Sequence, residues 1–404
     1  MKMRIWGAIL FMAFVTVLAG TQPGFGAGFA LYEGSARGNA LGGTLVGRAD
    51  DASALFYNPA GITQLPGLQI MGGFTAIAPK TDVVIGGVSH ESLDNIWTPP
   101  HFYTTYQFTD RMWLGLGMFS QYGLGTEFES TWPGRFNNYK AIIQSLTFNP
   151  TMAFKISDKL SLAAGVDVVW FDLELRQFIR GTNVDQTLAG DSTGYGYNLA
   201  LHYKPCDYAR IGISYRSQVT QEVVGDADFT PNTLFRDSGV EGSVTLPDML
   251  FLGVTIYPMD RLSLEVGGVF THWATFDELT ILYDTPLPTG ATRATSPKNW
   301  HNTWRFQFGA EYKTTDWLDL RVGYSYDEEP VPDSTVDYIV PANDRHLISF
   351  GPGFHWNNWT LDLSYTYLII EERDVQARTT SSIFDSKFED GHAHMFGASV
   401  GYKF

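Results

Sequence analysis

Hydrophobic and polar residues alternate along most of the chain in short segments, and the alternation is clearest at the C-terminus. Between Phe396 and Phe404, one face of an extended chain would carry aromatic and aliphatic side chains, and the other glycine, serine and lysine. A repeat of two residues indicates a β-strand with one apolar face. The same pattern recurs upstream, for example over residues 304–312 and 320–326.

The alternation predicts fourteen strands. Their expected ranges are 67–79, 99–108, 111–120, 143–156, 160–173, 193–204, 208–218, 246–257, 261–272, 301–313, 317–327, 346–356, 359–371 and 391–404. An even number of strands lets an antiparallel sheet close on itself without an edge of unpaired N–H and C=O groups. The predicted fold is therefore all-β, a 14-stranded antiparallel transmembrane β-barrel over residues 67–404.

Two features indicate that the apolar side of these strands faces lipid rather than a protein core. Aromatic residues cluster at strand ends, as they do in the girdles of membrane barrels; they are Tyr203, Tyr257, Trp304, Tyr312, Trp317 and Trp359. Short turns also alternate with long polar stretches, which lie near 80–98, 121–142, 176–193, 219–244, 275–300, 327–345 and 372–391. Short periplasmic turns and long external loops are typical of outer-membrane barrels, so we prefer this class to a soluble sandwich.

The N-terminus has the layout of a secretory signal peptide. Lys2 and Arg4 precede an uncharged apolar run over residues 5–19, and small residues follow as far as Gly26. We expect cleavage after Gly26, so that residues 1–26 are removed on the way to the outer membrane. A retained membrane anchor is the alternative, although the apolar run is short for a span.

The composition excludes several classes of protein. Aromatic residues make up 15% of the 404 residues, which is too dense for a disordered chain. Only the N-terminus has an apolar run that approaches a membrane-spanning helix. The single cysteine, Cys206, excludes an internal disulfide bond. The net charge of −16 argues against a general nucleic-acid binder.

Residues 27–66 do not alternate, and small residues dominate them. A barrel of this size encloses a lumen that needs filling, and irregular backbone is tolerated at membrane depth where protein surrounds it. We therefore predict that residues 27–66 form a plug inside the barrel. Pro59 fixes φ and Gly61 permits a positive φ, which together would shape a tight turn against the wall.

The plug segment resembles the FadL/TodX family of outer-membrane transporters for long-chain fatty acids and other hydrophobic compounds. The resemblance is carried by residues 27–31, 35–38, 49–53 and 56–61, and by residues 123–126 and 132–135 of the second long loop. It implies ligand capture between external loops, a lumenal site gated by the N-terminus, and lateral release through the wall at a kinked strand. The family motif places the gating aromatic at Phe29 and the plug triplet at Asn58, Pro59 and Ala60.

The sequence also offers candidate residues for the kink in the strand and for the contact with the ligand headgroup. Gly115 and Gly117 of the third strand could weaken the hydrogen-bond ladder there, or could simply leave room for the plug. Because successive strand residues face opposite sides, the position of each residue along its strand predicts whether it faces the lumen. This alternation places four arginines in the lumen, namely Arg210, Arg216, Arg305 and Arg321. We predict that Arg216 and Arg321 bind a fatty-acid carboxylate. The alternative is that these arginines anchor the plug through the lumenal acids Asp167, Glu265, Glu311, Asp319 and Asp362.

In one stretch, charged residues occupy the strand face that is expected to be apolar. Asp172, Glu174 and Arg176 continue the face that carries Leu162 and Val166, so charge follows apolar residues on one side of the strand. Either a bulge near Phe171 or an exit of the strand from the bilayer would explain the change.

Other functions have weaker signals. His392 and His394 share a face, but two imidazoles alone are a poor metal site, so we predict neither a metal, a cofactor nor an enzyme. The plug argues against a general diffusion porin, and an adhesin or phage receptor stays open. Fatty acids are preferred to monoaromatic hydrocarbons as the substrate. The expected partners are this substrate and outer-membrane lipids, and the expected state is a monomer.

Overall fold

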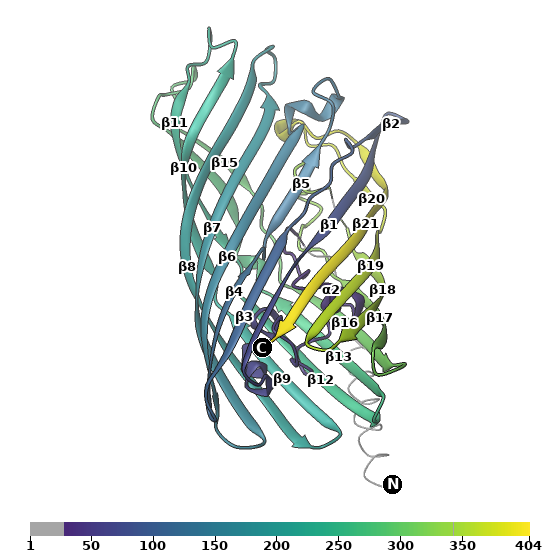
Figure 1. Ribbon diagram of the computed structural model, residues 1–404. Coiled ribbons are helices and arrows are strands. Elements are labelled where there is room, and N and C mark those ends of the chain that lie inside the picture. The colour runs from purple at the N-terminus through teal and green to yellow at the C-terminus, as the bar shows by residue number, and fades with distance from the viewer. Residues whose placement is uncertain (1–27, 342) are drawn as a thin grey trace.

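The computed structural model describes residues 28–341 and 343–404, which form a closed antiparallel β-barrel (Figure 1). The first and last strands, β1 (Leu68–Ile85) and β21 (Ser386–Lys403), pair from Gln69 opposite Lys403 to Ile85 opposite Ser386. This pairing closes the sheet, so the prediction of a 14-stranded antiparallel barrel is confirmed.

The chain runs along the wall of the barrel fourteen times, and we call each of these runs a stave. Seventeen of the strands in the described residues build the fourteen staves, because three staves are interrupted and consist of two strands each. In chain order the staves are β1, β3 (Pro100–Thr109), β4 (Met112–Phe119) with β5 (Gly123–Glu127), β6 (Lys140–Lys155), β7 (Leu160–Phe178), β8 (Asp185–Cys206), β9 (Ala209–Arg216) with β10 (Val219–Thr230), β11 (Ser238–Leu246) with β12 (Met249–Met259), β13 (Leu262–Thr271), β16 (Thr303–Lys313), β17 (Leu318–Asp327), β18 (Arg345–Trp356), β19 (Trp359–Ile370) and β21. The long connections carry β2 (Val88–Glu91), β14 (Glu278–Tyr283), β15 (Arg293–Pro297) and β20 (Arg373–Val375), with short 3₁₀ turns η2 (Pro133–Phe136), η3 (Trp273–Thr275) and η4 (Thr379–Ser381).

The alternation separates an apolar outer surface from a buried inner one. In β21, Phe396 and Val400 are exposed, whereas the intervening Ser399 is 1% exposed and faces the lumen. Large exposed apolar side chains recur on every side of the barrel, as a lipid-facing surface requires.

The expected loop ranges were partly wrong, since several strands continue well beyond the bilayer. β10 and β11 occupy most of residues 219–244, which the sequence placed in a loop. Their upper parts pair with each other and with β8 and β14, and their inner faces bury Phe229 and Val240. The backbone groups of these hairpins are therefore paired above the membrane, where water would otherwise have satisfied them.

The parity question at residues 172–176 has a plain answer. β7 pairs with β8 without a break from Leu160 to Phe178, so there is no bulge at Phe171. Glu174 stays on the outer face, where it forms ion pairs with Lys140 and Arg176. The unbroken pairing rules out the bulge, and the ion pairs favour the second alternative, in which the strand leaves the bilayer at this height.

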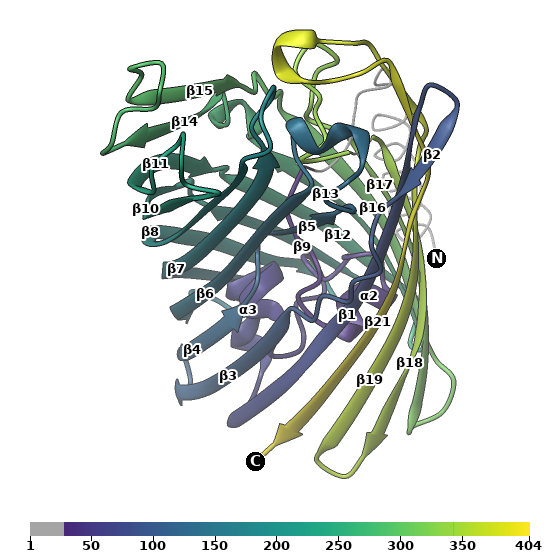
Figure 2. The same ribbon diagram turned by 90° about the horizontal axis from the view of Figure 1, so that it is seen from above.

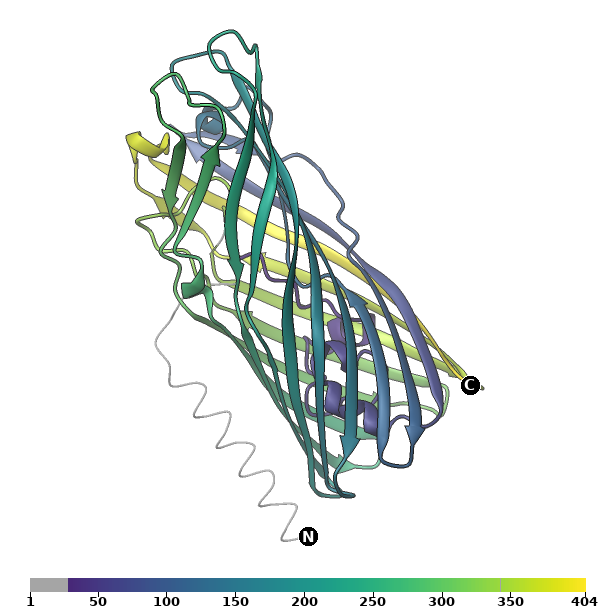
Figure 3. The same ribbon diagram turned by 90° about the vertical axis from the view of Figure 1, so that its left-hand side faces the viewer.

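Residues 28–66 lie inside the barrel, near the end where short turns join the strands (Figures 2 and 3). They contain two short helices, α2 (Ala36–Ala40) and α3 (Ala54–Tyr57), and the 3₁₀ helix η1 (Pro59–Gln64). Ser35 caps α2 by accepting a hydrogen bond from the backbone N–H of Gly38. No helix in the described ranges is long and apolar enough to cross a membrane.

Candidate functional site

Asn58, Pro59 and Ala60 form the turn that fixes the plug against the wall. The Asn58 side chain accepts a hydrogen bond from the Ala60 N–H, and its amide donates to the Val46 carbonyl at 2.8 Å and the Leu201 carbonyl at 3.0 Å. Pro59 is the first residue of η1, where its missing N–H leaves no hydrogen bond unmade. This triplet joins two parts of the plug to β8.

Gly61 is required for a reason other than the expected one. It is absent from the residues with positive φ and lies within η1. A Cβ at this position would lie 2.2 Å from the Cβ of Ala49. Close packing between two turns of the plug, rather than backbone conformation, therefore excludes a side chain here.

Arg216 and Arg321, the two predicted carboxylate partners, both bond to other groups of the protein. Arg216 Nη1 lies 2.7 Å from Asp167, and Nη2 donates to the Leu55 carbonyl of the plug at 2.6 Å. Arg321 pairs with Glu311 at 2.7 Å and with Asp362 at 2.5 Å. These contacts favour the alternative in which the two arginines anchor the plug.

The plug contributes two arginines to the same network. Arg37 donates two hydrogen bonds to Glu311, each of 2.9 Å. Arg48 is 1% exposed and pairs with Glu265 of β13 at 3.2 Å. Glu265 also accepts hydrogen bonds from three consecutive plug N–H groups, those of residues 46–48. The plug is thus bound to several parts of the wall by buried, charge-assisted hydrogen bonds.

Phe29 lies in an aromatic cage at the top of the plug. Its ring centroid is 4.7 Å from that of Trp273, 5.7 Å from Trp300, 5.8 Å from Phe276 and 6.2 Å from Tyr122. The side chain is only 3% exposed. These ring contacts hold the N-terminal segment in place above the plug.

The segment beside Phe29 pairs with an interruption in the third stave. The Leu31 N–H donates to the Gln121 carbonyl at 2.8 Å, and the Gly123 N–H donates to the Phe29 carbonyl at 2.9 Å. Between β4 and β5, three residues (120–122) stand opposite two residues of β6 (145–146). This is a β-bulge, which bends a strand and ends regular pairing.

Gly115 and Gly117 lie below this bulge in regularly paired β4. A Cβ at Gly115 would lie 2.5 Å from the Leu55 side chain of the plug, and one at Gly117 would lie 3.0 Å from Phe119. Gly115 leaves room for the plug, and the interruption of the stave begins three residues after Gly117.

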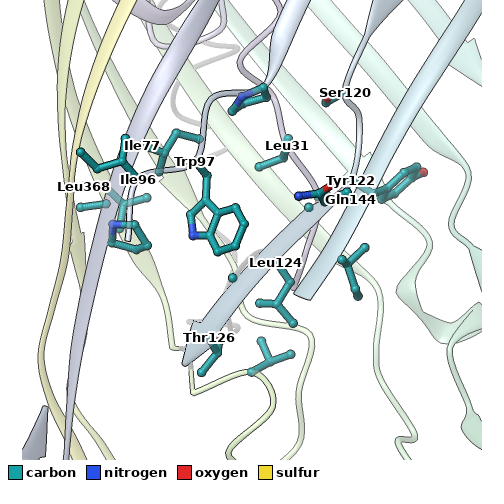
Figure 4. A pocket seen from close by; sticks show the side chains of 18 of the residues that line it. Leu31, Ile77, Ile96, Trp97, Ser120, Tyr122, Leu124, Thr126, Gln144 and Leu368 are labelled. Atoms are coloured by element: carbon teal, nitrogen blue, oxygen red, sulfur yellow. The ribbon is translucent and has the colours of Figure 1, made fainter. Parts of the chain in front are cut away.

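A cavity of about 640 Å³ lies above the plug, next to the bulge (Figure 4). Its apolar lining includes Leu31, Ile77, Trp97, Leu124 and Leu368. Pockets of about 300–1,000 Å³ with mostly apolar walls are typical binding sites for small ligands. This cavity is therefore the candidate functional site.

Arg345 is a half-buried cation in the cavity wall. It shares the carboxylate of Asp327 with Arg305, at 3.1 and 3.2 Å respectively. The Nε atoms of both arginines are buried and have no hydrogen-bond partner among the described residues. Two neighbouring carboxyls are only partly ionised near neutral pH, because burial raises the pKa of Glu329 to about 8 and that of Asp344 to about 7. The inner end of the cavity thus holds more positive than negative charge near neutral pH.

The sequence reasoning did not identify Arg345, Trp97 or the bulge. Arg345 follows a long connection, so no alternating neighbours on its N-terminal side assign it to a face. Trp97 precedes β3 by three residues and reads as part of a polar loop. The bulge begins at residue 120, where the third strand was expected to end, so the alternation of that strand gave no signal for it.

Of the two histidines near the C-terminus, His392 belongs to the lining of the cavity, whereas His394 is exposed on the outer face. His394 accepts or donates a hydrogen bond with the Tyr365 hydroxyl on the outer face, and His392 bonds to the Asp390 carbonyl. Among the described residues, no group of three or more histidine, cysteine, aspartate or glutamate side chains could hold a metal ion.

A closed barrel with an apolar outer surface, an internal plug and an apolar cavity defines an outer-membrane transporter of hydrophobic molecules. The chain belongs to the family of outer membrane protein transport proteins (OMPP1/FadL/TodX), whose family model matches residues 17–404. The resemblance noted in the plug is therefore confirmed, as is the expectation that the protein is not an enzyme.

Similar proteins span nearly the whole chain. The long-chain fatty acid transport protein of *Escherichia coli* (strain K12) is 25% identical over 448 residues, with 97% of this chain and 98% of that protein covered. The crystal structure of a *Pseudomonas aeruginosa* FadL homologue matches with a TM-score of 0.80 at 21% identity and covers 94% of this chain and 100% of that one. The *Pseudomonas putida* toluene transporter TodX matches with a TM-score of 0.71 at 19% identity, with 94% and 99% covered.

Proposed function

We propose that the protein transports long-chain fatty acids passively across the outer membrane, with the acyl chain in the cavity and the carboxylate at Arg345. The observation that carries this proposal is the Nε atom of Arg345 at the wall of an apolar cavity, which is buried and has no hydrogen-bond partner among residues 28–341 and 343–404. A carboxylate would supply the missing acceptor in a charge-assisted hydrogen bond, worth about 1.5–3 kcal/mol. Each buried methylene would add about 0.8 kcal/mol.

The comparisons support a hydrophobic substrate and leave two classes open. The *E. coli* relative is named for long-chain fatty acids, and the *P. putida* structure is that of a toluene transporter. Uptake of monoaromatic hydrocarbons is our second candidate, since the cage around Phe29 would suit an aromatic ring. We prefer fatty acids because a hydrocarbon would leave the Arg345 donor unpaired.

The proposed route begins between the long connections and ends sideways in the membrane. An apolar cluster that includes Leu188 and Phe229 lines the upper barrel, and Leu124 joins this cluster to the cavity. The segment 29–31, bonded to residues 121–123, would gate the lumenal site. Release through the bulge at residues 120–122 would avoid the plug, which is bonded to the wall below.

The Arg345→Gln variant tests the carboxylate contact. We expect its affinity for oleate to fall roughly tenfold or more, since about 1.4 kcal/mol corresponds to a factor of ten, while its affinity for oleyl alcohol changes little. Equilibrium binding to the purified barrel, followed by tryptophan fluorescence, measures both. Lys80→Gln is the control, because Lys80 lines the cavity but is 46% exposed and paired with Asp94.

Equal losses for oleate and oleyl alcohol, or no loss for either, would reject Arg345 as the carboxylate partner. Binding of toluene without binding of oleate would move the assignment to hydrocarbon uptake.

A further inference from the structure

The wall beside the bulge has a gap in its hydrogen-bond ladder. On one side lies β5, which pairs only with β6 among the described strands. On the other side lies the segment 92–99 between β2 and β3, which is bonded to β1 through Ile77 and Thr75. In the described backbone, one hydrogen bond joins this segment to β5, from the Leu93 N–H to the Glu127 carbonyl at 2.8 Å. Below that bond, side chains rather than backbone pairs fill the wall.

The indole of Trp97 fills this gap. It packs directly on the backbone of Gly125, where a Cβ would lie 2.2 Å from the indole Nε1 and Cε2 atoms. Figure 4 shows Trp97 projecting into the cavity between Ile77 and Leu124. The Trp97 Nε1 atom is buried, and it has no hydrogen-bond partner in the described part of the chain. Packing alone therefore holds the ring across the gap, and no hydrogen bond of its side chain has to break when it moves.

The cavity extends to both sides of Trp97. Leu31 and Leu368 belong to its lumenal wall, with Leu368 only 8% exposed. Ile96 and Trp170 also line it, although they are 70% and 38% exposed on the outer surface. A ligand that passes from the first set of residues to the second must pass the indole.

We infer that Trp97 is the side-chain gate of the lateral exit and that it limits the width of the molecules that leave. The inference rests on the proposed function, since it assigns a residue to the release step. Rotation of the indole away from Gly125 opens a path wide enough for an acyl chain, and the ring closes it again after the chain has passed. Gly125 is part of the same device, because any side chain there would occupy the closed position of the ring.

Release kinetics test the gate. Oleate is bound to the barrel in nanodiscs, and its transfer to acceptor vesicles is followed by stopped-flow fluorescence. We expect Trp97→Ala to release oleate at least tenfold faster than the wild type, and Gly125→Ala to change the rate in the same direction by displacing the ring. Trp97→Phe keeps an aromatic ring without the N–H group and should stay within threefold of the wild type. Phe350→Ala, a change on the outer surface away from the cavity lining, should leave the rate unchanged.

The width of the opening supplies a second readout. Trp97→Ala should accelerate the release of a pyrene-bearing fatty acid more than the release of oleate. Release of both ligands by Trp97→Ala within twofold of the wild-type rates, with the barrel folded as judged by its heat-modifiable migration, would overturn the gate. Wild-type protein that binds no oleate would instead overturn the proposed function.

Discussion

Single arginines in the lumen fall into two groups according to how their charge is matched. Arg216 and Arg321 each bond to carboxylates or to the plug backbone, so a ligand would have to break buried hydrogen bonds to reach them. Arg305 and Arg345 share a single carboxylate, that of Asp327, so two positive charges face one negative charge there. Since an anion can form a charge-assisted hydrogen bond with a cation whose charge is not already matched, the second group is the better site for a carboxylate.

Phe29→Ala should weaken ligand binding without unfolding the barrel. The ring fills an aromatic cage, and Phe→Ala substitutions in such sites typically cost about 3–5 kcal/mol. The lost packing free energy destabilises the segment 29–31, which pairs with the bulge, and not the strands of the wall. Oleate titration and thermal unfolding of the same sample measure the two effects.

The matched control for this prediction is Phe350→Ala, since Phe350 is 52% exposed on the outer surface. If Phe29→Ala binds oleate as tightly as Phe350→Ala does, the N-terminal segment has no gating role.

The lumen-facing residues could be predicted from parity, whereas their partners could not. Arg216, Arg305 and Arg321 were all expected to face the lumen, and they are 1–4% exposed. Their partners depend on where the plug lies, because Arg216 meets the Leu55 carbonyl 161 residues away in the sequence. Local pattern carries no information about contacts at such separations.

At the scale of elements, the long connection between β17 and β18 forms a roof over the cavity. In this roof segment, defined as residues 328–341, Val340 and Pro341 line the cavity. Asp337 pairs with Lys298 at 2.6 Å, which ties the segment to the connection before β16. The segment therefore lies between the cavity and the outside, and a ligand that enters from above must displace or pass it.

The roof segment should loosen as pH rises, because it buries a protonated carboxyl. Burial raises the pKa of Glu329 to about 8, against the smaller opposing effects of Arg373 and Arg345, while Asp344 adds to the rise. Asp344 is itself raised to about 7 by burial, with Glu371 and Glu328 adding to the rise and Tyr326 and His346 opposing it. The closed segment then binds more protons than the open one between pH about 4.5 and about 8. Its stability falls across that window and levels off above it.

Hydrogen exchange of the roof segment, corrected for intrinsic exchange rates, measures this loss. Glu329→Gln mimics the protonated carboxyl and should reduce the pH dependence. Glu372→Gln is the control, since Glu372 forms an exposed ion pair with Lys387. A wild-type segment whose protection is constant from pH 5 to pH 9 would contradict the assignment.

Strand existence could be predicted from the sequence far better than strand ends. Six expected short turns are present, including the turns between β3 and β4 and between β18 and β19. The upper ends of β10 and β11 were missed because their outer faces carry polar residues such as Glu222 and Glu241, which resemble a loop in composition. Outside the bilayer the outer face of a hairpin meets water, so only its inner face has to be apolar. These strand ends therefore lack the outward-facing aromatic residues that mark the strands within the membrane.

At the scale of the whole molecule, the plug and the wall direct the ligand sideways. Residues of the plug bond to strands around the barrel, including β8 through Asn58, β9 through Arg216 and β13 through Glu265. Movement of the whole plug would break these contacts together, whereas movement of residues 29–31 and of Trp97 would leave them intact. The smallest change that opens the cavity is therefore at the wall.

The proposed fatty-acid transport is tested most directly by the uptake of radiolabelled oleate into Gram-negative cells that lack their own long-chain fatty acid transporters. We predict that the wild-type protein restores oleate uptake and that Arg345→Gln, folded and present in the outer membrane at the same level, restores much less. Uptake no greater than that of cells with an empty vector, with the wild-type barrel folded in the outer membrane, would contradict the account.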